Sequence, residues 1–267
     1  MSISDPDALQ VVYAHGSGTL KSDYYDAFAL IHPGIFDTRD RADHARKRKI
    51  VSHVFSPKSV LEFEPYIRLH VGELLTQWDK LAEGGKKGLS GEDGDGGWFG
   101  RDGWVWFDCL PWYNYLSFDI IGDLAFGSPF GMLKAGKDIA PVVKSQTDAM
   151  VTYGNEKAEV EVEYFPAIRI MGEGADHAAS MGVLPRWVRP LWMIFHPWYR
   201  EGGTAMANAF GIVIAAVSKR LKHPTDRVDI LSKLLEGKDS EGKRMGREEL
   251  TAEAGTLLGA GSDTTSR

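Results

Sequence analysis

The segment 247–267 constrains the fold most, because it joins a helix-forming sequence to an acid–hydroxyl pair. Its first turn is acidic, and the helix dipole favours negative side chains at that position. Gly259 and Gly261 each cost a helix roughly 1 kcal/mol relative to alanine, which is tolerable where a planar group must lie against the backbone. Asp263 and Thr264 would then form a proton-relaying pair beside that group. The alternative is a turn or helix cap.

A second segment, residues 43–57, has a basic centre and predicts a helix that ends at a Ser-Pro pair. His44 and Arg48 are four residues apart, so both side chains lie on one face of this helix. Such a pair of donors suits an anionic group, and a guanidinium binds a carboxylate through two parallel hydrogen bonds. The basic run, residues 46–49, also fits a solvated surface or a nuclear localisation signal.

Residues 260–265, Ala-Gly-Ser-Asp-Thr-Thr, resemble the (A/G)-G-x-(D/E)-T-(T/S) signature on the distal helix of cytochrome P-450 haem-thiolate monooxygenases. The resemblance implies that Thr264 and Asp263 are the catalytic pair. They would deliver protons for O–O bond cleavage, which requires groups within hydrogen-bond reach. It also implies that Ala260 and Gly261 bind the cofactor by forming the surface that faces the haem.

The basic helix resembles the same family, because His44 and Arg48 match the (W/H)-x-x-x-R pair on its third helix. The resemblance implies that these two residues hold a haem propionate. We expect the remaining cations, Arg46, Lys47 and Lys49, to face outward and to dock an acidic reductase by electrostatic steering. An unrelated helical binding protein that uses the basic run for an acidic partner is the alternative.

Three further segments extend the resemblance along the chain. Residues 116–127 have apolar side chains at helical spacing and resemble the fifth-helix segment of fungal members. Residues 15–25 resemble the loop that roofs the substrate pocket, and residues 5–13 complete an array most similar to the fungal benzoate 4-monooxygenases. The implied reaction is the para-hydroxylation of benzoate or a related aromatic acid with O₂. The implied electron source is NADPH, through NADPH–cytochrome P-450 reductase.

A small carboxylate in an apolar pocket requires at least one positive or hydrogen-bonding partner. The roof loop offers four candidates for contact with a small aromatic substrate. They are Thr19, Lys21, Tyr24 and Tyr25.

Two family motifs are expected on the C-terminal side of the Asp-Thr-Thr motif, and this sequence ends two residues after it. The family fixes haem iron through the cysteine of an F-x-x-G-x-R-x-C-x-G loop and braces the fold with an E-x-x-R helix. The single cysteine, Cys109, has aromatic neighbours, so we expect a buried, inert thiol and reject it as the axial ligand. The thiolate is expected from missing C-terminal sequence, and no metal ligand is assigned here. A non-catalytic truncated remnant is therefore a further alternative.

The predicted fold is mainly α, a partial cytochrome P-450 domain over residues 1–267 that is truncated at both ends. It contains the central helices up to the distal oxygen-binding helix, and the haem-ligand region is missing. The glycine-rich segment 83–103 is expected to be a flexible insertion, because its composition cannot bury a core. Helices are predicted at residues 56–81, 111–126, 138–152, 203–222 and 226–236, and from residue 247 to the end.

The composition excludes several classes of protein. A hydrophobic content of 43% supports one large core or two modest ones, and a net charge of −6 argues against nucleic-acid binding. One cysteine excludes a disulfide framework. No apolar run reaches the ~20 residues that span a bilayer. We expect the chain, which has no anchor, to be cytoplasmic, and a full-length relative to lie on the cytosolic face of the endoplasmic reticulum membrane.

Overall fold

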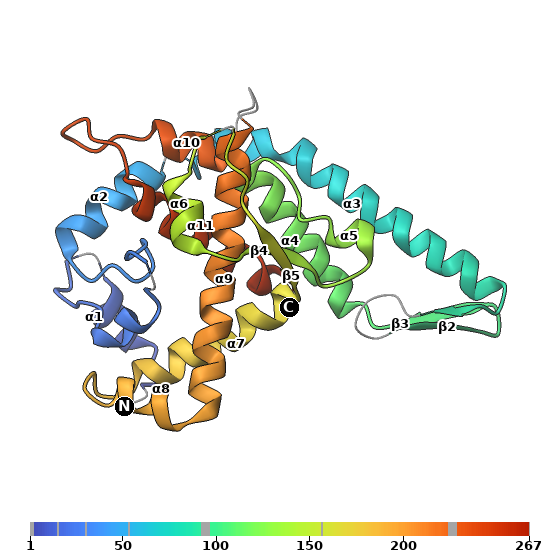
Figure 1. Ribbon diagram of the computed structural model, residues 1–267, viewed down its shortest axis with the longest axis horizontal. Helices are drawn as coiled ribbons and strands as arrows, with labels where there is room; N and C mark the ends of the chain where they lie inside the picture. Colours follow the sequence, from blue (N-terminus) through green and yellow to red (C-terminus); the bar gives the residue numbers. More distant parts are fainter. Residues whose placement is uncertain are drawn as a thin grey trace.

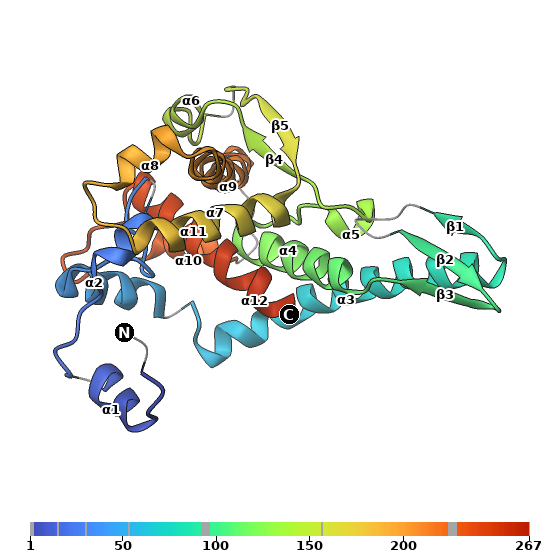
Figure 2. The same cartoon turned by 90° about the horizontal axis from the view of Figure 1, so that it is seen from below.

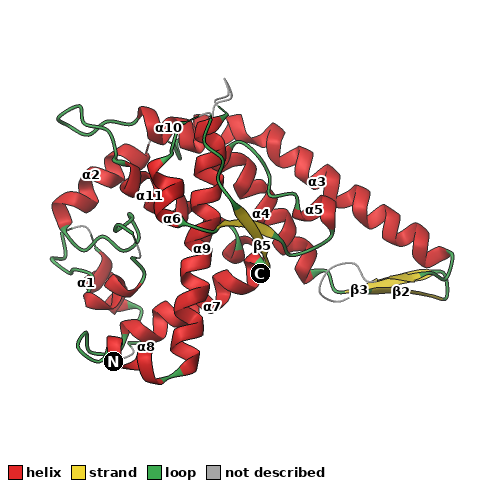
Figure 3. Cartoon of the chain, in the orientation of Figure 1, coloured by secondary structure: helices red, strands yellow, loops and turns green. Residues whose placement is uncertain are grey.

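The computed structural model describes residues 3–14, 16–29, 31–52, 54–91, 97–155, 157–223 and 229–266. Helices dominate these residues, which confirms the predicted mainly α fold (Figure 1 and Figure 3). The helices are α1 (Asp7–Tyr13), the 3-10 helix η1 (Asp23–Ala27), α2 (Arg41–Ser52), α3 (Pro57–Lys86), α4 (Leu110–Phe126), α5 (Met132–Ala135), α6 (Gln146–Val151), α7 (Ala167–Gly182), α8 (Arg189–Phe195), α9 (Pro197–Lys222), α10 (Ile230–Glu236), α11 (Arg247–Gly261) and α12 (Asp263–Ser266).

Two small antiparallel sheets accompany the helices. The first joins β1 (Ser90–Gly91), β2 (Trp98–Arg101) and β3 (Trp104–Phe107), in that order. The second pairs β4 (Ala140–Val143) with β5 (Val162–Phe165). Figure 2 shows the first sheet beside the C-terminal end of α3 and the second sheet beside α9.

The core forms where α4 lies between α3 and α11. Tyr115 and Phe118 of α4 are fully buried, as are Ile212 and Ile214 of α9. α7 packs along α9, and β4 covers another side of α9. This arrangement supports α11 along its length, because α4 and α9 both contact it.

The predicted start of α3 and both predicted boundaries of α4 agree closely with the structure. Ser56 caps α3, since its side chain accepts a hydrogen bond from the backbone N–H of Ser59, and Pro57 occupies the first turn. Gly127 ends α4 in the left-handed conformation with φ of 74°, as its place after the apolar run predicts.

The segment 83–103 contains regular structure in its described part. α3 continues through Lys86, and β1 and β2 follow. Gly84 and Gly85 let the sheet pack on α3, because a Cβ at these positions would lie 2.4 Å from the Trp98 ring and 2.7 Å from Val105 Cβ. Residues 92–96 lie outside the described residues. Flexibility of the insertion stays a prediction.

The helix predicted at 138–152 is wrong in its first half. Residues 140–143, Ala-Pro-Val-Val, form β4, because proline interrupts a helix and adjacent valines favour a strand. α6 begins only after Ser145, whose side chain accepts from the backbone N–H of Asp148. The helix predicted at 226–236 begins at Ile230, with a capping box at Asp229; residues 226–228 lie outside the described part.

Across the described parts of the chain, no helix is both long and apolar enough to cross a lipid bilayer.

Candidate functional site

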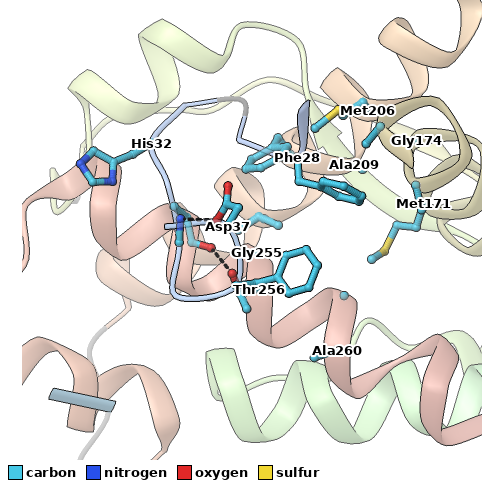
Figure 4. A pocket seen from close by; sticks show the side chains of 18 of the residues that line it. Phe28, His32, Asp37, Met171, Gly174, Met206, Ala209, Gly255, Thr256 and Ala260 are labelled. Carbon is cyan, nitrogen blue, oxygen red and sulfur yellow. Dashed lines mark hydrogen bonds between the residues drawn. The ribbon is translucent and has the colours of Figure 1, made fainter. Parts of the chain in front are cut away.

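An apolar cavity of about 460 Å³ lies between α7, α9, α11 and the loop that precedes α2 (Figure 4). Most of its wall is aliphatic, aromatic or glycine surface. Its polar side chains come from the loop, from α11 and from α12. The lining residues are Phe28, His32, Gly34, Phe36, Asp37, Met171, Gly174, Ala175, Ala178, Met206, Ala209, Phe210, Val213, Ala252, Gly255, Thr256, Gly259, Ala260 and Thr264.

α11 supplies one side of this cavity through small residues. Gly255, Gly259 and Ala260 carry no side chain or only a methyl group, so a bound group could approach the backbone of α11 closely here. Thr264, on the short helix α12, closes the same side and donates a hydrogen bond from its hydroxyl to the Ala260 carbonyl oxygen at 2.6 Å. The structure therefore brings two of the predicted site residues, Ala260 and Thr264, to one cavity.

The predicted continuous helix breaks at Ser262, where ψ is −83°. Asp263 begins α12 after this break and does not line the cavity. Gly261 faces α4, because a Cβ at this position would lie 2.8 Å from Ile121 Cδ1. Packing against Ile121 therefore accounts for Gly261, and its contact with haem stays a prediction.

The loop before α2 supplies the opposite side of the cavity. Phe28 and Phe36 line it, with ring centroids 5.5 Å apart. Tyr24 and Tyr25 extend this aromatic cluster, at 5.4 Å and 6.5 Å from Phe28. Both tyrosines lie behind the lining, and Tyr24 packs against Gly182 of α7.

The Lys21 side chain binds backbone carbonyl groups of the loop. Its ammonium group donates to the carbonyl oxygens of Ile35 at 3.1 Å and Phe36 at 2.5 Å. Burial lowers the pKa of Lys21, against the opposing charges of Asp37 and Glu253. Thus none of the four substrate candidates lines the cavity, since Thr19 is exposed on the surface. His15, in the same predicted roof loop, lies outside the described residues.

His44 and Arg48 are on α2, and neither lines the cavity. His44 is half-buried and Arg48 is exposed. Burial lowers the pKa of His44, and the positive charges of Lys21 and Arg48 lower it further. The surroundings of His44 are therefore electropositive, which suits an anionic group. Their contact with a haem propionate stays a prediction.

The prediction that Arg46 and Lys47 face outward is wrong. Arg46 binds the carboxylates of Asp43 and Glu249, and Lys47 is fully buried with its ammonium group on the Pro33 carbonyl oxygen. The reason is that the acidic side of α11 packs toward α2. Lys49 is exposed, as predicted. The structure therefore does not support the alternative of a binding protein that presents the whole basic run, residues 46–49, to an acidic partner.

Two buried carboxyl groups beside the cavity were not identified from the sequence. Burial raises the pKa of Glu253 to about 7, and it also raises the pKa of Asp37. Asp37 Oδ1 accepts the backbone N–H of Gly34 at 2.7 Å. His32 lines the cavity from the same loop. The two loop residues, Asp37 and His32, do not belong to a periodic pattern, so the sequence gives no signal that they line a cavity.

Cys109 is exposed, which contradicts the predicted buried thiol. It precedes the first turn of α4. Its sequence neighbours Trp106 and Leu110 are exposed with it, so the apolar composition of the segment does not imply burial of the thiol. Over the described residues, no cluster of three His, Cys, Asp or Glu side chains could hold a metal ion.

Comparisons with known proteins agree on one family. The sequence profile of the cytochrome P450 family matches residues 1–267. Benzoate 4-monooxygenase bphA of Aspergillus niger is 43% identical over 99% of this chain and 47% of its own length. Trichothecene C-15 hydroxylase of Fusarium sporotrichioides is 26% identical over 99% of this chain and 45% of its own. The chain thus spans about half the length of the curated relatives it matches.

The fold is similar to a solved structure, the heme domain of cytochrome P450DA. The TM-score is 0.58 at 17% sequence identity, and the match covers 92% of this chain and 43% of that one. At this identity the likeness concerns the fold alone. It agrees with a partial fold of the same kind.

Proposed function

Because the chain belongs to the cytochrome P450 family, we propose that it forms part of a haem-thiolate monooxygenase that hydroxylates benzoate, or a related aromatic acid, at the para position. The apolar cavity between α7, α9 and α11 carries this proposal. Its volume of about 460 Å³ lies within the range of small-molecule sites and leaves ample room for one benzene ring. The 43% identity to a benzoate 4-monooxygenase supports the proposed substrate class.

The surface of α11 fits a planar cofactor at one end of this cavity. A Cβ on Gly259 would have only Met171 Cε near it, at 4.0 Å, so the helix offers a low surface there. We assign Ala260 and Gly261 to this surface, and His44 and Arg48 to a haem propionate. Haem, when bound, supplies the activation of dioxygen. Cys109 is exposed beside α4, so we propose that the thiolate ligand is not part of this chain.

The residues of the chain itself would orient the substrate and move protons. Phe28 and Phe36 would hold the aromatic ring, and the apolar wall would exclude water. Thr264 would pass a proton through its hydroxyl, which in this structure donates a hydrogen bond to the Ala260 carbonyl oxygen. Asp263, adjacent in sequence, would resupply that proton.

We also propose that NADPH–cytochrome P-450 reductase supplies the electrons, at the cytosolic face of the endoplasmic reticulum membrane. Family membership supports this assignment. Of the cations predicted to dock the reductase, Lys49 on α2 is exposed and remains available for electrostatic docking.

A chimera tests the function. The chain replaces the matching half of Aspergillus niger bphA, and the product of benzoate is identified by mass spectrometry with purified reductase and NADPH. We expect 4-hydroxybenzoate. The carbonyl spectrum of the reduced chimera serves as the folding control, because thiolate-bound haem gives a red-shifted band. A chimera with this band that binds benzoate but forms no product would favour the non-catalytic alternative. One that does not bind benzoate would refute the assigned substrate.

A further inference from the structure

The cavity has one polar end formed by Asp37 and Thr256, and His32 lines the cavity from the same loop as Asp37. Figure 4 shows Asp37 close to Thr256, with Met171 and Met206 on the facing helices. Thr264 marks the other end, eight residues beyond Thr256. This spacing corresponds to about 12 Å of α-helix, somewhat changed by the break at Ser262. A benzoic acid with its carboxyl group at the polar end would thus direct its para carbon toward Thr264.

The polar end contains a carboxyl group and no dedicated cation. The lining residues that the structure describes include no lysine and no arginine. The two nearby ammonium groups have other partners. Lys21 donates to the carbonyl oxygens of Ile35 and Phe36, and Lys47 donates to Pro33 and lies 3.6 Å from Glu249 and 3.9 Å from Glu253.

Asp37 is therefore the main ionisable group that a ligand carboxylate would meet. Asp37 is only 7% exposed, and its carboxylate accepts a hydrogen bond from the backbone N–H of Gly34. The hydroxyl of Thr256 donates to the Ala252 carbonyl oxygen at 3.1 Å, so its proton is already engaged. The charged or titratable groups around Asp37 are Lys21 and His32 from the loop, Lys47 from α2 and Glu253 from α11.

Two carboxylates in one desolvated site cannot both stay ionised without a large cost, and the usual solution is to share one proton. We propose that the cavity binds an aromatic carboxylate together with one proton from solvent, which is held between the ligand and Asp37. This inference rests on the proposed function, because that function supplies the ligand. The Asp37 carboxyl then donates a hydrogen bond to the ligand, and no cation is needed at this end.

The proposal predicts that benzoate affinity depends on pH. At pH values where benzoate and Asp37 are both ionised, the affinity should fall about tenfold for each unit of rising pH, because one proton is taken up per ligand bound. Benzamide has the same shape, is neutral and donates its own hydrogen bond. The affinity of the chain for benzamide should therefore stay constant over the same pH range.

Isothermal titration calorimetry on the chain tests the proposal. Benzoate and benzamide are titrated at about pH 6 and about pH 8, in two buffers of different ionisation enthalpy, so that proton uptake is counted directly. We expect uptake of about one proton with benzoate and of none with benzamide. Asp37→Asn replaces the shared proton by a permanent amide donor, so it should bind benzoate without uptake.

His32 provides the control, because an imidazole could also take up the proton. His32→Gln should retain the proton uptake, and loss of uptake in this variant would overturn the assignment to Asp37. Benzoate binding without proton uptake in the unaltered chain would overturn the inference and leave the proposed function standing. If neither ligand binds to the folded chain while the chimera still forms 4-hydroxybenzoate, this inference alone is overturned. If the chimera also fails to bind benzoate, the proposed substrate is refuted as well.

Discussion

The ammonium group of Lys47 lies 3.9 Å from Oε1 of Glu253, and both side chains are buried, with relative exposures of 0% and 2%. The two residues belong to α2 and α11. Lys47 also donates to the Pro33 carbonyl oxygen, and Glu253 accepts a hydrogen bond from the Ile35 backbone. This pair therefore fastens the cavity loop to both helices.

Removal of the buried ammonium group should destabilise the fold strongly. Lys47→Met leaves Glu249 and Glu253 without their shared cation and the Pro33 carbonyl oxygen without its donor. We expect the free energy of unfolding to fall by about 3–5 kcal/mol, as for other buried ion pairs that lose one partner. Urea titration followed by circular dichroism measures this change. Lys49→Met, on the exposed side of α2, should alter stability by less than about 0.5 kcal/mol. Equal effects of the two substitutions would contradict the buried position of Lys47.

Glu253 should make stability depend on pH. Its pKa is about 7 in the folded chain, against 4.5 for an unperturbed glutamate, so the folded state binds more protons between these values. The free energy of unfolding should therefore decrease by about 3 kcal/mol as the pH rises through this window, and this contribution should be constant outside it.

Glu253→Gln removes this titration and keeps an acceptor for the Ile35 N–H. The variant should lose that decrease, as measured by thermal unfolding across the pH range. Glu248→Gln, at an exposed position in the same helix, should preserve the profile of the unaltered chain. An unchanged profile in Glu253→Gln would show that other groups produce the pH dependence.

Local pattern predicted the helices well where one face is apolar, as in α3, α4 and α9. The Asp-Thr motif and the glycines within one short segment also drew attention to Ala260 and Thr264. Both line the cavity, and their roles stay predictions. Local pattern failed where the deciding partner is distant in sequence. Arg46 turns inward because Glu249, 203 residues away, faces it.

The polar end of the cavity could not be predicted for a related reason. Asp37 and His32 lie in a loop without periodicity, and only the packing of that loop on α11 brings them to the cavity. The break at Ser262 directly follows Gly261, which packs against Ile121 of α4. The sequence allowed such a helix end only through the alternative of a turn or helix cap in this segment.

A larger side chain in the cavity should block the ligand without unfolding the protein. Gly255 lines the cavity, and its Cβ position is 3.6 Å from Phe210 and 3.7 Å from Val213, which is ordinary contact. Gly255→Leu should therefore fold, and we expect it to weaken benzoate binding at least about tenfold, a cost of about 1.4 kcal/mol. Calorimetry with benzoate measures the effect. Gly172→Leu makes the same change on the exposed side of α7, where nothing lies within 4 Å, and should leave the affinity unaltered. Undiminished affinity in Gly255→Leu would place the ligand elsewhere.

Alanine substitutions at two glycines in the last turns of α11 should change the free energy of unfolding in opposite directions. At Gly261 the new Cβ would lie 2.8 Å from Ile121 Cδ1 and 2.9 Å from its Cγ1, so we expect Gly261→Ala to cost about 1–3 kcal/mol. At Gly259 the nearest atom is Met171 Cε at 4.0 Å, and alanine should gain up to about 1 kcal/mol because it favours the helix.

Chemical denaturation of both variants measures the two changes in the free energy of unfolding. A double-mutant cycle then tests whether contact with Ile121 causes the loss at Gly261. Ile121→Ala removes the two atoms that Gly261→Ala would meet, so the second substitution should cost less in this background than in the unaltered chain. Additive effects would mean that α4 does not restrict residue 261. In that case the glycine would have to be explained by a bound group at the α11 surface, as the family resemblance implies.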